Sequence, residues 1–113
     1  MEQMETEYEL RNHISSISYK IIEAMEARDL DALKGYISDN VEVTETGLVF
    51  GKREFSYPNG DISRLRERGF GFYKDSFVIY IEYNKNGKYD GQFNMYYIEE
   101  NGKWKLHEIE RDI

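Results

Sequence analysis

Apolar residues in the first quarter of the chain recur at the 3.6-residue period of a helix that buries one face. The positions that form this stripe are Met4, Tyr8, Ile14, Ile17, Ile21 and Met25. Glutamates at positions 2, 5, 7 and 9 come at its start, where the helix dipole favours negative charge. The pattern predicts a helix over residues 4–27. Asp29 then predicts the start of a second helix, because its carboxylate can cap the free N–H groups of a first turn.

The pattern changes several times between residues 41 and 69. Residues 41–45 alternate and predict a strand, and residues 48–50 predict a short second strand after a turn. Residues 51–60 contain the only proline and predict a loop. Asp61 is a candidate cap for a third helix over residues 62–68, and Gly69 is a candidate left-handed terminator of that helix.

The C-terminal half predicts three long strands, over residues 77–83, 89–99 and 103–111. The pairs Asn86-Gly87 and Asn101-Gly102 separate them. An Asn-Gly pair between strands favours a type I′ turn, which needs a positive φ at both positions. The whole pattern predicts an α+β fold, in which N-terminal helices pack on a curved antiparallel sheet.

The two turns predict which residues face each other. With two-residue turns, Tyr97 faces Leu106 and Val78 faces Met95. One face of the sheet then carries Val78, Tyr80, Phe93, Met95, Tyr97, Trp104 and Leu106. The other face carries Phe77, Ile79, Ile81, Tyr83, Tyr96, Ile98 and Ile109. The apolar phase shifts between Leu106 and Ile109, which predicts a β-bulge or a bend there.

Both predicted faces are apolar, whereas a sheet with one solvated side alternates cleanly. One layer of helices covers one face, so a second subunit is expected on the other, in a homodimer. The residues expected at this contact are Phe77, Ile79, Ile81, Tyr96, Ile98 and Ile109. Gly69, Gly71 and Gly91 are expected bend points of the curved sheet.

The size and composition are those of a single small domain over residues 1–113. The chain has no cysteine, which excludes disulfides and thiolate metal sites. Its formal net charge of −7 disfavours binding to nucleic acid. No apolar run reaches the ~18 residues of a membrane span, and the acidic N-terminus lacks the apolar segment of a secretory signal. A cytoplasmic location is therefore expected.

The long helix, the short helix that opens with DLDAL at residues 29–33, and the DNVEV segment at residues 39–43 resemble the start of the NTF2-like (cystatin-like) superfamily. That group includes the ketosteroid isomerases and the SnoaL-like cyclases. ENGKWKL at residues 100–106 looks like the family's last hairpin. The resemblance implies a cone of sheet around helices, with a pocket at its open end. It implies a general base at Glu45, but the isomerases' oxyanion-donor tyrosine is replaced by Ile21 and their usual proline by Thr46.

The candidate chemical groups are few. Glu45 is a candidate pocket base, or alternatively a solvated strand carboxylate. Tyr80, Phe93, Tyr97 and Trp104 are candidate pocket residues, although tyrosine also suits half-buried sheet positions. The chain's histidines, at positions 13 and 107, lack the spacing of a metal motif, so neither a metal nor a cofactor is expected.

Three functions are compatible with these features. The first is a non-enzymatic module that binds a small apolar molecule or a protein. The second is an isomerase-, cyclase- or dehydratase-like enzyme with Glu45 as the base and a pocket tyrosine as the oxyanion donor. The third is an acidic inhibitor or immunity-type protein that binds a basic partner.

Overall fold

The computed structural model describes residues 2–58 and 62–112, and within them leaves out the side chains of residues 2–7, 63, 64 and 112. The described residues form two helices and two antiparallel sheets, so the α+β class is confirmed. The helices are α1 (Glu2–Ala27) and α2 (Leu30–Tyr36). The strands are β1 (Glu42–Val43), β2 (Gly47–Phe50), β3 (Arg53–Ser56), β4 (Ile62–Tyr73), β5 (Ser76–Lys85), β6 (Lys88–Glu100) and β7 (Lys103–Asp112).

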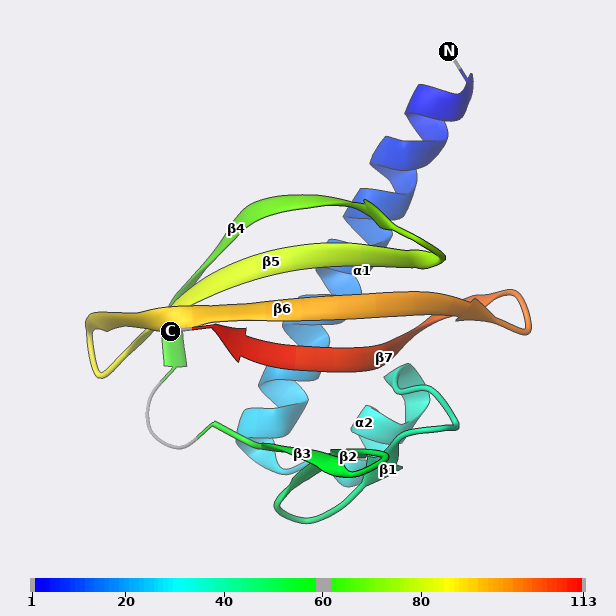
Figure 1. Ribbon diagram of the computed structural model, residues 1–113. Helices are drawn as coiled ribbons and strands as arrows, with labels where there is room; N and C mark the ends of the chain where they lie inside the picture. The colour runs from blue at the N-terminus through cyan, green and yellow to red at the C-terminus, as the bar shows by residue number, and fades with distance from the viewer. Residues whose placement is uncertain (1, 59–61, 113) are drawn as a thin grey trace.

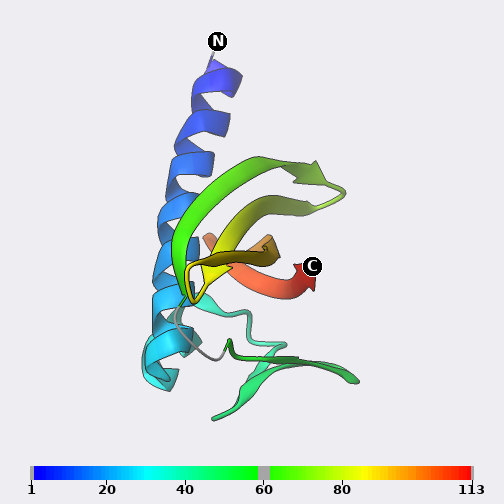
Figure 2. The same ribbon diagram turned by 90° about the vertical axis from the view of Figure 1, so that its left-hand side faces the viewer.

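The helix α1 crosses one side of the four-stranded sheet β4-β5-β6-β7, and its N-terminal turns project beyond that sheet (Figures 1 and 2). The predicted apolar stripe is buried from Ile14 onward, where Ile14, Ile21 and Met25 have no exposed surface, whereas Tyr8 near its start is 60% exposed. Arg28 ends the helix with a φ of 57°. The Asp29 N–H bonds to Ala24 O and the Arg28 N–H to Met25 O, which together satisfy carbonyls of the last turn.

The short helix α2 confirms the predicted cap. The Asp29 carboxylate accepts a hydrogen bond from the Ala32 N–H at 3.2 Å. After α2 the chain becomes extended and meets the outer edge of β7, where the Ser38 N–H donates to Leu106 O at 2.8 Å. This contact closes part of an edge strand that would otherwise expose free hydrogen-bonding groups. Neither described helix has the length and apolar character needed to cross a membrane.

The smaller sheet has the order β1-β2-β3 and lies beyond the β7 edge of the larger one (Figure 1). The two predicted strands over residues 41–50 correspond to β1 and β2. The loop predicted over residues 51–60 is wrong in part, because β3 forms inside it and pairs with β2. Gly47 allows that pairing: a Cβ at this position would lie 2.2 Å from Phe55 O.

The helix predicted over residues 62–68 is wrong, because this segment is the first half of β4. Arg66 and Arg68 lie beside β5 and form ion pairs with Glu82 at 3.5 and 2.9 Å. Helix propensity is a weak prior, and pairing with a long neighbouring strand overrides it here. Gly69 is therefore not a helix terminator but part of β4, opposite Tyr80. The cap predicted at Asp61 lies outside the described residues.

Both Asn-Gly turns are confirmed. Asn86 and Gly87 have φ values of 55° and 84°, and Asn101 and Gly102 have values of 52° and 80°. The pairs that flank them are Lys85 with Lys88 and Glu100 with Lys103, as two-residue turns require.

The strand register predicted beyond the first turn is wrong by one residue. Between β5 and β6 the pairing shifts after Tyr83, which faces Gly91, so that Ile79 rather than Val78 faces Met95. Between β6 and β7 it shifts again, so that Tyr97 faces Leu106 while Met95 faces Ile109. The second shift is the bulge predicted from the apolar phase. Gly69 and Gly91, two of the expected bend points, both lie at register shifts.

These shifts gather most of the apolar residues of the sheet on one face, the one packed against α1. Its members, each no more than 1% exposed, are Phe77, Ile79, Ile81, Tyr83, Phe93, Met95, Tyr97, Leu106 and Ile109. The predicted assignment of residues to the two faces is therefore wrong, although Val78, which is 2% exposed, is a buried apolar residue of the opposite face. Because side chains alternate along a strand, the opposite face carries mainly polar and half-buried residues, such as Glu82, Gln92, Asn94 and Tyr96.

Candidate functional site

Two of the predicted pocket residues, Phe93 and Tyr97, lie in the closed core between the sheet and α1. The Phe93 ring stacks on Tyr83 with 4.4 Å between centroids and meets Phe55 edge-on at 6.1 Å. The Tyr97 hydroxyl lies 2.6 Å from Ser18 Oγ, which itself donates to Ile14 O at 2.7 Å, so the tyrosine is the donor to the serine. Burial raises the pKa of Tyr97.

The other two pocket candidates are separated from this core and from each other. Tyr80 is half-buried and lies on the face of the sheet away from α1, opposite Asn94. Trp104 lies on the α1 side but near the β6–β7 turn, where it is half-buried and meets Phe77 edge-on at 6.5 Å. The four predicted residues therefore do not line one pocket.

Glu45 is exposed in the turn between β1 and β2. Together with Arg28 and Leu30 it lines an open hollow of about 380 Å³. Ile21, which stands where the isomerases have their tyrosine, is fully buried in the core.

The predicted dimer contact is divided between the two faces. Phe77, Ile79, Ile81 and Ile109 are buried within the single chain, so they provide no surface for a second subunit. Tyr96 and Ile98 lie on the opposite face and are half-buried. The homodimer itself stays a prediction.

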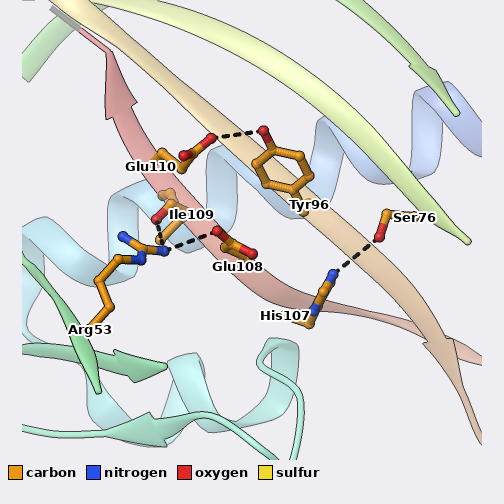
Figure 3. A network of polar contacts seen from close by, with 7 residues as sticks. All are labelled: Arg53, Ser76, Tyr96, His107, Glu108, Ile109 and Glu110. Carbon is orange, nitrogen blue, oxygen red and sulfur yellow. Dashed lines mark hydrogen bonds and ion pairs between the residues drawn. The ribbon is translucent and has the colours of Figure 1, made fainter. Parts of the chain in front are cut away.

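The face away from α1 carries a network of polar contacts (Figure 3). The Tyr96 hydroxyl donates to Glu110 at 2.7 Å, and burial and this carboxylate raise the pKa of Tyr96. Arg53 of β3 donates to Ile109 O at 3.0 Å and reaches Glu108 at 3.4 Å. The Arg53 contacts attach the smaller sheet to β7, whereas the Tyr96–Glu110 bond joins β6 to β7, so both serve to hold strands together.

A groove with free polar groups lies on the α1 side of the sheet, near the β6–β7 turn and around Trp104. We call it the Trp104 groove; it has a volume of about 490 Å³ and is larger than the hollow beside Glu45. Its lining residues are His13, Ser16, Ile17, Lys20, Gly35, Tyr36, Gly102, Lys103, Trp104 and Lys105. They come from α1, from the end of α2 and from the β6–β7 turn, three segments that only the fold brings together.

The α1 contribution has a recognisable spacing. His13, Ser16, Ile17 and Lys20 stand at i, i+3, i+4 and i+7, which places them on one stripe of the helix. This stripe lies directly beside the core stripe, with Ile17 belonging to both. Sequence reasoning identified Trp104 and missed its partners, although this second stripe was the signal that could have found them.

The charge of the groove is opposite to that of the chain. The chain has 22 acidic and 15 basic residues, yet none of the described residues that line the groove is acidic. Lys105 Nζ donates to Gly35 O at 2.6 Å, which ties the hairpin to α2. No ion pair between described residues involves Lys20 or Lys103, and both side chains are exposed.

Among the side chains that the structure describes, no three of His, Asp or Glu gather closely enough to hold a metal ion. Comparison of the chain with protein-family models, with curated proteins and with solved structures finds no match.

Proposed function

We propose that this chain is a non-enzymatic binding module with an NTF2-like fold, and that its small-molecule site is the Trp104 groove. The observation that carries the proposal is a half-buried tryptophan beside an open groove of about 490 Å³. Ligand sites typically measure about 300–1,000 Å³ and combine apolar walls with a few polar groups. The order of α1, α2 and β1 and the tryptophan in the last hairpin support the NTF2-like part.

The groove offers the chemistry of a binding site. Trp104, Ile17 and Tyr36 supply apolar surface on which a flat ligand can stack, and the indole N–H and the Ser16 hydroxyl supply hydrogen-bonding groups. The described lining contains no carboxylate. His13, its one histidine, is exposed and has no described partner to orient it, as the base of a catalytic pair normally has. These features favour binding over catalysis.

The test uses Trp104 itself, because it is the only tryptophan and gives a single indole N–H signal. The probe is 2-naphthamide, a flat neutral molecule, added to ¹⁵N-labelled protein. We expect the indole signal to shift and to saturate at a probe concentration below the millimolar range. An indole signal that stays in place up to millimolar probe overturns the proposal.

A matched pair of variants locates the site. Tyr36→Ala removes a groove wall, whereas Tyr89→Ala removes a tyrosine that is 62% exposed and lies outside the groove. We expect only Tyr36→Ala to weaken naphthamide binding, measured by calorimetry on folded variants. Equal affinities of the two variants contradict the placement of the site.

Two further expectations from the sequence stay predictions with their own tests. A homodimer predicts twice the chain mass in sedimentation at micromolar concentration, and a monomeric mass contradicts it. An acidic inhibitor predicts capture of a basic protein that is lost as salt increases, because screening weakens attraction between exposed charges. Failure to recover such a partner at low salt counts against that function.

A further inference from the structure

The basic side chains of the Trp104 groove are concentrated around its apolar wall. Lys103 and Lys105 flank Trp104 in β7, and Lys20 approaches from α1. Three lysines and no described acidic residue line this groove, on a chain with a net charge of −7. A positive site on a negative protein is a local feature of the fold, not a consequence of composition.

The three lysines differ in the contacts that their ammonium groups already make. Lys105 donates to Gly35 O, but an ammonium group has three N–H donors, so further donors remain available. Lys20 and Lys103 make no ion pair with any described residue. A ligand carboxylate at the groove can therefore meet ammonium groups that form no ion pair with a described carboxylate.

We infer that the groove takes a small organic anion, namely a flat apolar body that carries one carboxylate, with the body on Trp104 and the carboxylate among Lys20, Lys103 and Lys105. This inference rests on the proposed function, because it assigns the ligand chemistry of the same groove. The apolar wall supplies affinity for the body, and the lysines select its charge.

The experiment compares three probes with the same body and different charge: 2-naphthoate, 2-naphthamide and 2-naphthylmethylammonium. Binding is measured by calorimetry and by the Trp104 indole signal at 20 mM and at 300 mM salt. At low salt we expect naphthoate to bind about tenfold more tightly than the amide, because each ammonium contributes a few-fold in a water-like dielectric. The ammonium probe binds most weakly, and high salt reduces the differences.

Two lysines in equivalent positions provide the matched variants. Lys103 follows Asn101-Gly102 and lines the groove, whereas Lys88 follows Asn86-Gly87 at the other hairpin and does not. We expect Lys103→Gln to lower naphthoate affinity about threefold and to leave naphthamide affinity unchanged. Lys88→Gln leaves both unchanged.

The outcomes separate the two claims. If none of the three probes binds, the proposed function fails and the inference fails with it. If all three bind equally, at both salt concentrations, the binding function holds and the anion inference is overturned. If naphthoate is preferred but Lys103→Gln and Lys88→Gln behave alike, the preference does not come from the groove lysines and the inference is likewise overturned.

Discussion

The α1 side of the four-stranded sheet has a closed end and an open end, built from the same strands. At the closed end, Phe93 and Tyr83 are sealed by Phe55 and by the second half of α1. At the open end, Trp104 is half-buried and Phe72 is 56% exposed. The two ends have similar aromatic residues and differ in their cover. Where α1 presents isoleucine and methionine the sheet becomes core, and where it presents His13, Ser16 and Lys20 the sheet borders a groove.

The curvature of the four-stranded sheet adds to the difference in burial between the two ends. The β4–β5 hairpin extends past α1 (Figure 1), and near its tip α1 contributes the Arg11 guanidinium, which lies 5.7 Å from the centroid of the Phe70 ring. Phe70 and Phe72 share the face of the core residues Ile79 and Phe77, yet they are 41% and 56% exposed. Membership of the apolar face therefore does not by itself predict burial; the position along the strand decides it.

The largest expected effect is at the closed end. Phe93→Ala leaves a cavity between Tyr83 and Phe55 and is expected to lower the free energy of unfolding by about 3–5 kcal/mol. Phe72→Ala, on the same face at the open end, is expected to cost less than about 1 kcal/mol because the ring is already largely in water. Urea unfolding measures both. Similar costs for the two would remove the distinction between the ends.

Trp104→Ala is expected to affect stability less than Phe93→Ala does, but to have a large effect on ligand binding. Its half-buried ring contributes about 1–2 kcal/mol to the free energy of unfolding, less than Phe93 does. Because it forms the apolar wall of the groove, its loss is expected to weaken naphthoate binding at least about tenfold, measured by calorimetry on folded protein. Unchanged affinity in Trp104→Ala would separate the groove from the ligand.

Tyr97→Phe tests the buried hydroxyl of the closed end. Ser18 keeps its bond to Ile14 O, so the variant is expected to lose about 0.5–1.5 kcal/mol near pH 7. The contribution of Tyr97 to the free energy of unfolding also depends on pH. Burial raises the pKa of Tyr97 above the 10.0 of an unfolded tyrosine, so its contribution is complete below pH 10 and is lost as the pH rises towards the folded pKa.

The corresponding measurement is urea unfolding from pH 9 to 11.5. The wild-type chain is expected to lose stability more steeply above pH 10 than Tyr97→Phe does, by at most about 1.4 kcal/mol for each pH unit. The other tyrosines with a raised pKa, such as Tyr83 at about 12, are present in both chains and cancel in the comparison. Parallel pH curves would mean that Tyr97 ionises freely.

The smallest effect is expected at Glu45, which belongs to neither end. Glu45→Gln changes an exposed turn residue, so the free energy of unfolding is expected to stay within about 0.5 kcal/mol and naphthoate affinity to stay unchanged. Calorimetry and urea unfolding check both. A loss of affinity in this variant would move the ligand to the hollow that Glu45 shares with Arg28 and Leu30.

Much of the fold was predictable because its signals are local. The Asn-Gly pairs specify their turns through the positive φ that both positions need, and Asp29 specifies the start of α2 through its side chain. The first half of β4 was not predictable in this way. Arginine, leucine and glutamate favour a helix at residues 62–68, and only the presence of β5 makes the same residues a strand.

The strand register likewise could not be predicted from local signals, because a shift of one residue changes it. A single extra residue in β6, between the turn and Gly91, moves Phe77, Ile79 and Ile81 onto the α1 side. Because side chains alternate strictly, this shift exchanges the two faces of a whole strand, which is why the β5 residues of the predicted dimer contact are part of the core. Only the bulge near Ile109 left a trace in the apolar pattern.

The sequence by itself therefore determined the α+β class, the buried α1 stripe from Ile14 onward and both hairpin turns. The tertiary structure alone decided which face is buried, where the smaller sheet docks, and that Lys20, Tyr36 and Lys103 surround Trp104. The physical reason is the separation along the sequence of the residues that interact. Turns and caps depend on a few neighbouring residues, whereas the groove is defined by residues 13–20, 35–36 and 102–105, three segments that are brought together only by packing.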